Sequence, residues 1–305
     1  MAGKKDIHQY ETLADLYQDL GIKIRQKAEF TIENVREVHQ TIPYKSPIFR
    51  TNYYSFVFVK NGRGNYTTDD QTFEYTSRTI YFTNPGHLKG FEFYELEEAY
   101  LITLSESFLK TNVHSEIFRE FPFLLAETVP PQTLSEKEFQ VFERIYLHIL
   151  EEYRGNSQYK FPVIGNLFVV LLLKIKEQFW SGYIPLEEGD RSSQIVKRFK
   201  QHLEKHYRDL AEGKISQHFQ AQDYAHLQHL HPNYLNTVIK SKTGRSISNW
   251  IAEKTATEAK ALLKNSSLSI KEIGIQLGFH ETAHFSNFFK KQTSQSPSAF
   301  RKIFR

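Results

Sequence analysis

The chain of 305 residues contains no cysteine, which excludes disulfide bonds, thiolate catalysis and zinc sites made of cysteine. Long hydrophobic runs are also absent. The longest, Leu167 to Leu173, is far shorter than the roughly 20 residues that a membrane-spanning helix needs. The first 20 residues have no apolar core like that of a signal peptide. We therefore expect a protein of the cytoplasm.

The composition is that of an ordinary folded protein, with 40% hydrophobic and 24% charged residues, and its length suffices for two domains. The net charge of +4 hides an asymmetry. Residues 191–305 contain 19 Lys and Arg against 8 Asp and Glu, a net +11, and the remainder has a net charge of −7. A basic C-terminal third favours a nucleic-acid surface, and a basic face that is merely solvated is the alternative.

Residues 46–104 are aromatic and β-branched, and the turn residues Asn61-Gly62, Asp69-Asp70 and Asn84-Pro85-Gly86 interrupt them. This pattern predicts short antiparallel strands in a small barrel or sandwich. Because such barrels often enclose a ligand, alternating side chains on one face are candidates for an effector pocket. The candidates are Tyr54, Phe56, Phe58 and His87, and the alternative is that the three aromatic residues are simply core.

Two helices are expected after the strands. The first opens with Ser135 and Glu138 at capping-box spacing. The second, Phe161 to Trp180, is apolar on nearly every side, so we expect part of it, with Phe139 to Leu150, to form a homodimer interface. Gly, Pro, Ser and acidic residues then indicate a linker at 184–193, between a first domain at 1–183 and a second at 194–305.

The C-terminal third repeats one pattern. The segments "YAHLQHLHPNYLNTVIKSKTGRSISNWI" (224–251) and "EIGIQLGFHETAHFSNFFKKQTSQSPSAF" (272–300) align at an offset of 50. Leu235 matches Phe285, Lys240 matches Lys290, and small Ala225 matches small Gly274 at an offset of 49. A small residue in a first helix, a sharp turn and an apolar i, i+3, i+4 stripe in a second helix are the requirements of a helix-turn-helix.

The opposite faces of the two second helices are short and polar, which suits a major groove, because Asn bonds bidentately to adenine and Thr or Ala meets the thymine methyl. The candidate base contacts are Asn233, Asn236, Thr237, Thr282, Ala283, Ser286 and Asn287, and the candidate phosphate contacts are Lys240, Lys242, Arg245, His284, Lys290 and Lys291.

At these residues the chain resembles the AraC family of bacterial transcription regulators, through "HPNYLNTVIKSKTG", "WIAEKTATEAKALLKNSSLSIKEIGIQLGF" and "HFSNFFKKQTSQSPSAFR". The resemblance implies two helix-turn-helix units joined by a linker helix at about Ile247 to Lys264, so that two recognition helices enter successive major grooves. It also implies an N-terminal cupin-like barrel followed by dimerisation helices.

Four residues depart from the commonest family pattern. Gly274 stands where Ala is usual, and Ser294 replaces the glycine that closes the last recognition helix. Gln228 occupies the place of a usual Leu, and Asn287 that of a frequent Arg. None interrupts the apolar stripes, and Asn287 predicts a base preference that differs from that of family members with Arg there.

The sequence supports an enzyme or a metal-binding protein less well than a DNA-binding protein. His226, His229 and His231 are close in sequence but have no carboxylate or cysteine partner at suitable spacing, and the strand region offers His87 alone. No phosphate loop or nucleophile elbow appears. We expect no cofactor, metal or enzymatic activity.

The sequence thus predicts an α+β protein of two domains, a cupin-like β-barrel with dimerisation helices and an all-α domain with two helix-turn-helix units. Its expected function is sequence-specific regulation of transcription, in most family members activation, in response to an effector or partner. The expected partners are promoter DNA, a second copy of the chain, RNA polymerase and a small-molecule effector. The alternatives are a cupin-type binding protein or metalloenzyme with a degenerate DNA-binding module, and an architectural DNA binder.

Overall fold

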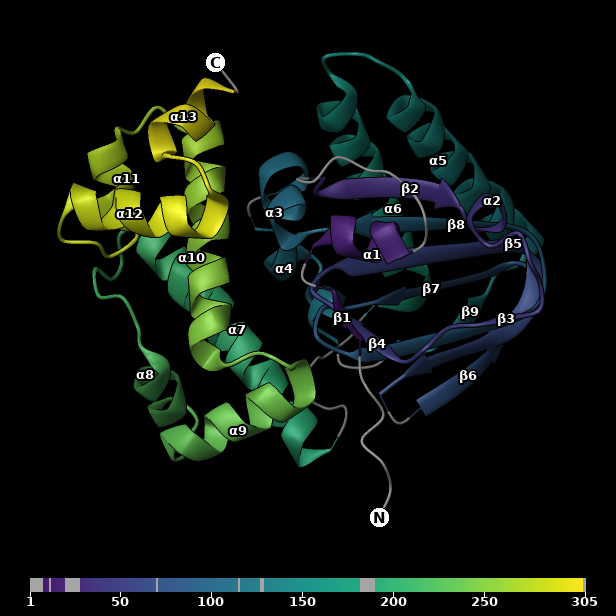
Figure 1. Ribbon diagram of the computed structural model, residues 1–305, viewed down its shortest axis with the longest axis horizontal. Helices are drawn as coiled ribbons and strands as arrows, with labels where there is room; N and C mark the ends of the chain where they lie inside the picture. Colours follow the sequence, from purple (N-terminus) through teal and green to yellow (C-terminus); the bar gives the residue numbers. More distant parts are fainter. Residues whose placement is uncertain are drawn as a thin grey trace. The chain divides into compact units, whose positions relative to one another are not determined.

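The computed structural model describes residues 8–10, 12–19, 28–69, 71–114, 116–126, 129–181 and 190–303 (Figure 1). The chain forms two compact units. The sheet unit comprises residues 1–113 and 126–183, and the helical unit comprises 114–125 and 184–305. We expected 114–125 in the first domain. Of the expected linker, 184–189 lie outside the described residues, whereas Asp190 caps a helix that begins at Arg191.

The sheet unit contains one sheet in the order β1-β4-β8-β5-β7-β9, with β2 and β3 also paired to β8, and β6 to β5. All of these pairs are antiparallel except β1 with β4. The strands are β1 (His8–Tyr10), β2 (Phe30–Asn34), β3 (Tyr44–Lys45), β4 (Phe49–Thr51), β5 (Tyr54–Thr68), β6 (Gln71–Tyr75), β7 (Thr79–Thr83), β8 (Leu88–Leu104) and β9 (Gln132–Thr133).

The long strands β5 and β8 form the centre of the sheet, in a register that runs from Tyr54 opposite Leu104 to Thr68 opposite Lys89, with irregularities between Val59 and Gly64. Among the described residues, the end strands β1 and β9 do not pair with each other. The sheet is therefore open, and the expected closed barrel was wrong. Closure needs ladder partners at both edges, and these edge strands have only three and two residues.

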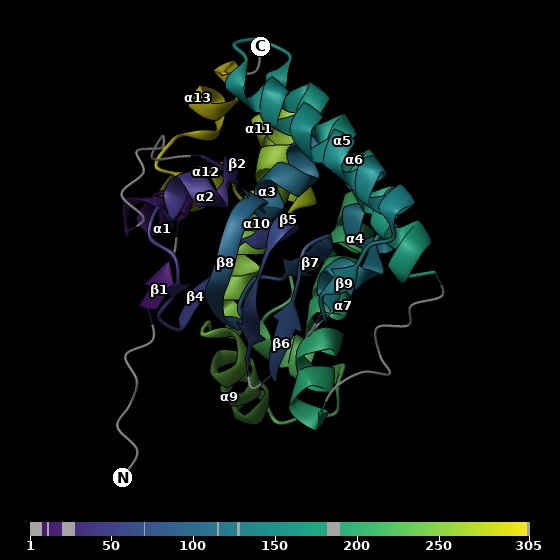
Figure 2. The same cartoon turned by 90° about the vertical axis from the view of Figure 1, so that its right-hand side faces the viewer.

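Two long helices, α5 (Glu136–Arg154) and α6 (Lys160–Phe179), lie side by side over one face of the sheet (Figure 2). The predicted capping box of Ser135 and Glu138 at the start of α5 is confirmed. Gly165 lets α6 approach the π-helix η1 (Leu109–Val113), because a Cβ there would lie 2.0 Å from the Asn112 carbonyl oxygen. The smaller helices are α1 (Leu13–Asp19), α2 (Val35–Val38) and α3 (Glu106–Phe108).

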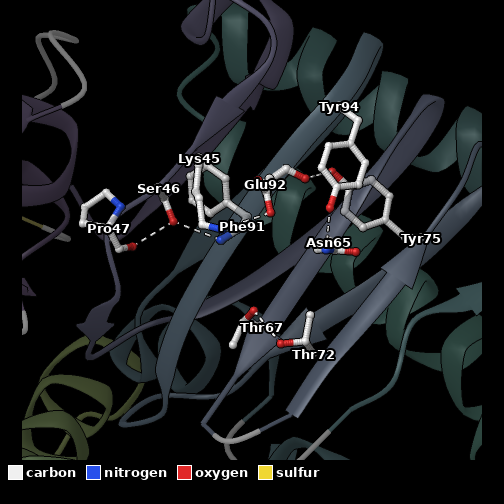
Figure 3. A network of polar contacts seen from close by, with 10 residues as sticks. All are labelled: Lys45, Ser46, Pro47, Asn65, Thr67, Thr72, Tyr75, Phe91, Glu92 and Tyr94. Atoms are coloured by element: carbon white, nitrogen blue, oxygen red, sulfur yellow. Dashed lines mark hydrogen bonds and ion pairs between the residues drawn. The ribbon is translucent and has the colours of Figure 1, made fainter. Parts of the chain in front are cut away.

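Part of the sheet carries a polar face (Figure 3). Lys45 Nζ lies 3.2 Å from Glu92 Oε2, and Asn65 Nδ2 donates to the Tyr94 hydroxyl at 2.7 Å. Successive residues of a strand point to opposite faces, so Phe91 and Phe93, the neighbours of Glu92, pack into an apolar cluster instead. This alternation is typical of an antiparallel sheet with one solvated face.

The helical unit is built of short helices around the two long helices α7 and α10 (Figure 1). Its elements are α4 (Ile117–Glu120), the 3₁₀-helix η2 (Pro122–Leu125), α7 (Arg191–Ala211), α8 (Ala221–His226), α9 (Pro232–Thr243), α10 (Ile247–Asn265), α11 (Ile270–Gln276), α12 (Thr282–Thr293) and α13 (Pro297–Lys302). The linker helix predicted at 247–264 is α10. No described helix is both long and apolar enough to cross a membrane.

Candidate nucleic-acid interface

The first helix-turn-helix consists of α8 and α9. Ala225 is fully buried, and its carbonyl oxygen accepts from the Leu230 amide at 3.0 Å across the turn. His231 caps α9 by accepting from the Asn233 amide at 3.3 Å through Nδ1, and Pro232 follows it. The left-handed Gly244, with φ of 78°, ends the helix. Contacts on its buried side, an N-cap and a C-terminal glycine thus fix the position of α9.

The second helix-turn-helix, α11 and α12, repeats this arrangement. Gly274 packs on Phe285, and a Cβ at this glycine would lie 3.2 Å from the Phe285 Cβ. Gly278, with φ of 83°, reverses the chain. The repeat extends to hydrogen bonds, since the hydroxyls of Thr243 and Thr293 donate to carbonyl oxygens four residues earlier at 2.8 Å. The offset of 50 therefore describes two equivalent units.

Helix α10 joins the two units. At its start, Trp250 Nε1 donates to the Thr243 hydroxyl of α9 at 3.0 Å. At its middle, buried Lys254 pairs with Glu204 and Glu258 and lies 5.2 Å from the centre of the Phe118 ring. Its 19 residues span about 28 Å at 1.5 Å per residue. This length approaches the 34 Å of one DNA turn, which separates successive major grooves.

The outward faces of α9 and α12 contain most of the predicted contact residues. Nine of them are exposed: Asn233, Thr237 and Lys240 on α9, and Thr282, Ala283, His284, Asn287, Lys290 and Lys291 on α12. Ser286 is half-buried. These side chains offer hydrogen-bond donors, acceptors and methyl groups between cations, which is what base edges and phosphates require.

Three predicted contacts lie differently. Asn236 is half-buried and its Oδ1 accepts from the Ile247 amide at 3.1 Å, so this oxygen is used inside the fold. Arg245 is only 4% exposed, pairs with Glu253 and stacks 3.8 Å above the Trp250 ring. A guanidinium enclosed in this way has no access to a phosphate, which corrects the expectation for Arg245. Lys242 is half-buried, 3.4 Å from Asp190 Oδ2.

Tyr234 is a surface residue that sequence reasoning missed. It lies in the first turn of α9 and is 43% exposed, beside Asn233. The offset of 50 aligns it with His284, which was selected in the other copy. Applying the repeat to every position, instead of only to short polar residues, would have found it.

The candidate effector residues of the sheet unit belong to its core. Phe56 lies edge-on to Phe168 of α6 at 5.0 Å, and Phe58 stacks on Tyr146 of α5 at 5.1 Å. Tyr54 is also buried, and His87 Nδ1 lies 2.6 Å from Asp69 Oδ2. Because α5 and α6 cover this face, the side chains of Phe56 and Phe58 fill space that was expected to hold a ligand. Within the described residues, no three His, Asp or Glu gather as metal ligands.

Known proteins are similar to the helical unit and, in at least one case, to most of the chain. A family model described as a helix-turn-helix domain matches residues 224–303. An uncharacterised helix-turn-helix transcriptional regulator of Bacillus subtilis is 23% identical over 86% of this chain and 81% of its own length. The arabinose operon regulatory protein of Escherichia coli is 27% identical over 52% of this chain and 51% of its own.

Among solved structures, the C-terminal domain of AraT, a response regulator from Geobacillus stearothermophilus, is 30% identical, and this chain covers 88% of it with a TM-score of 0.33. Paired helix-turn-helix units with exposed polar faces define a DNA-binding protein. The chain belongs to the AraC family of helix-turn-helix transcriptional regulators. It regulates transcription and is not an enzyme.

Proposed function

We propose that the protein is a sequence-specific activator of transcription that responds to an effector or partner through its sheet unit. The observation that carries this proposal is the repetition of one exposed polar face, 50 residues apart, on the two helices that follow the two turns. Two equivalent faces at the ends of α10 suit two successive major grooves. Binding of the effector or partner to the sheet unit would change how often the protein occupies its promoter or contacts RNA polymerase. Activation is the outcome that family resemblance implies.

In this proposal, bases are contacted by side chains on the first two turns of each recognition helix. They are Asn233 and Thr237 on α9 and Thr282, Ala283, Ser286 and Asn287 on α12. The cations Lys240, Lys290 and Lys291 lie in the last turns, where they approach phosphates. His284 and Lys242 add weaker phosphate contacts, because Glu281 and Asp190 lie close to them.

The sheet unit is proposed to form the homodimer. Large apolar side chains on α5 and α6 remain 40–44% exposed, namely Leu147, Phe161, Val170 and Leu173. Exposed apolar groups on neighbouring helices favour a second copy of the same surface. A dimer would present four recognition helices to a paired operator. We also propose that the protein works in the cytoplasm, where a bacterial regulator of transcription meets its DNA.

The test is selection of bound duplexes from a random DNA pool with the purified full chain. We expect enrichment of one sequence containing two elements about one helical turn apart, and binding that weakens steeply with salt, by roughly 0.9 in log K per log unit of salt for each phosphate contacted. A pool that remains random after repeated rounds, or binding that does not depend on salt, would exclude a sequence-specific regulator.

A further inference from the structure

A cavity of about 460 Å³ opens between helix α7 and the turn that precedes the first recognition helix. Arg191, Gln194, Ile195 and Arg198 line it from one face of α7, and Gln228 and Leu230 line it from the turn. The four residues of α7 follow the i, i+3, i+4, i+7 spacing of a single helix face. The cavity is therefore lined by one face of α7 on one side and by the turn between α8 and α9 on the other.

Gln228 is the unusual residue of this cavity. Its Nε2 and Oε1 atoms are both buried without a hydrogen-bond partner in the structure. A buried amide that lacks partners costs stability. An amide in this place is consistent with a ligand that completes its hydrogen bonds.

The charges around the cavity indicate an anion. Arg191 and Arg198 are exposed, and neither forms an ion pair with a carboxylate of the described residues. No acidic side chain lines the cavity. Burial, together with the cations of Lys205 and Arg198, lowers the pKa of His202, which lies one turn after Arg198. Two guanidinium groups and the amide Nε2 group of Gln228 form the kind of donor set that binds phosphate oxygens.

The location suggests which phosphate binds. Leu230 immediately precedes His231, the N-cap of α9, so the cavity lies beside the start of the first recognition helix. The DNA backbone that borders a major groove passes close to this end of a recognition helix.

We propose that the cavity of Arg191, Arg198 and Gln228 binds a phosphate group, in the DNA complex a backbone phosphodiester next to the bases that α9 contacts. Gln228 Nε2 and the two guanidinium groups donate to its oxygens. A guanidinium has five N–H donors, so Arg198 also has one for Gln228 Oε1. This inference rests on the proposed function as far as DNA is the source. A small phosphorylated molecule offers the same chemistry.

The first experiment measures DNA affinity of the full chain against salt, on the selected duplex. Arg198→Gln should lower the salt slope by about one unit, and Gln228→Leu should weaken binding about tenfold without changing charge. The matched control is Lys205→Gln, which removes a cation from the same helix two turns further on. Lys205 is outside the cavity, and its Nζ lies 2.9 Å from Asp209 Oδ2. This control variant should therefore have the DNA affinity and the salt slope of wild type.

The second experiment replaces DNA by inorganic phosphate, at constant ionic strength in chloride. A saturable rise of the thermal unfolding midpoint in wild type, absent in Arg198→Gln and Gln228→Leu, would identify a free phosphate compound as ligand. If phosphate has no such effect while the DNA results hold, the source is the DNA backbone.

The proposal is overturned if both variants bind DNA as wild type does and phosphate changes no midpoint. In that case the DNA affinity of Lys240→Ala tests the proposed function separately, because this residue does not line the cavity. Folding is checked by circular dichroism. Gln228→Leu should unfold at a higher temperature than wild type, since it removes two unpaired polar atoms, so weaker DNA binding by this variant is not a consequence of unfolding.

Discussion

Asn236 and Asn287 look alike in sequence but have different surroundings. Asn236 accepts from the Ile247 amide, which ties α9 to the start of α10, whereas Asn287 is exposed. We expect Asn236→Ala to lower the free energy of unfolding by about 1 kcal/mol and to weaken selected and random DNA alike. Asn287→Ala should cost about 1–3 kcal/mol on the selected DNA only. Urea unfolding and competition binding measure both effects; equal loss of discrimination in the two variants would contradict this assignment.

His206 makes the stability of the helical unit depend on pH. Its Nε2 lies 3.0 Å from the Gln217 carbonyl oxygen, which only accepts, so this nitrogen carries the proton and Nδ1 accepts from the Tyr224 hydroxyl at 2.7 Å. Burial lowers the pKa of His206 below its usual 6.5. The unfolded chain therefore binds a proton first as pH falls, and stability present above pH 6.5 is lost below it.

The corresponding prediction concerns His206→Gln, whose amide keeps a donor for the Gln217 carbonyl. Its free energy of unfolding should change less between pH 7.5 and pH 5 than that of wild type. With Trp180 replaced by Phe, the fluorescence of Trp250 reports on the helical unit alone, because the chain has two tryptophans. An identical pH dependence in wild type and His206→Gln would remove His206 as the cause.

For single residues, the sequence predicts which side of a helix a side chain occupies, but not which other residue it contacts. Periodicity placed Asn233, Asn287 and Lys290 on exposed faces. It could not show that Arg245, one residue after the glycine that ends α9, turns back onto Trp250, because that contact depends on how α10 leaves the turn. The same holds for the hydrogen bond from Ile247 to Asn236, which joins residues eleven positions apart.

The two recognition helices end differently, although both end in a left-handed residue. Gly244 closes α9 with φ of 78°, and Ser294 closes α12 with φ of 61°. A side chain in this conformation costs roughly 1 kcal/mol, which glycine avoids. Ser294→Gly should raise the free energy of unfolding by about that amount, and Gly244→Ser should lower it. Thermal unfolding of the two single variants and of the variant with both substitutions tests this prediction. A loss of stability in Ser294→Gly would contradict the prediction.

Among the elements, those with a strong local pattern were predicted best. The capping box of α5, the span of α10 and the repeated units follow from signals within a few turns of chain. Closure of the sheet does not follow from such local signals. It depends on the lengths of β1 and β9, which lie at the two ends of the sheet order. The burial of Phe56 and Phe58 likewise depends on α5 and α6, which follow them by about 80 residues or more.

On the scale of the whole molecule, the exposed apolar residues of α6 predict self-association. Val170 and Leu173 are each 44% exposed and lie three residues apart, on adjoining turns. The double substitution Val170→Glu and Leu173→Glu should shift a dimer to a monomer in sedimentation, since it places like charges opposite each other in a symmetric interface. Gln178→Glu, also exposed on α6, is the control for added charge. A wild-type monomer at tens of micromolar, with and without DNA, would rule out the interface.

The membership of residues 114–125 in the helical unit has a consequence for any attempt to take the protein apart. The chain passes between the two units three times, near residues 113, 125 and 183. A single proteolytic cut between residues 181 and 190 therefore leaves the larger fragment holding one piece of the helical unit, including the Phe118 ring beside Lys254. We expect the two fragments to elute together from a sizing column in native buffer and to separate only in denaturant. A bacterial expression clone that begins at residue 191 should yield a less stable helical unit than the nicked protein, because it lacks a segment that no later part of the chain replaces.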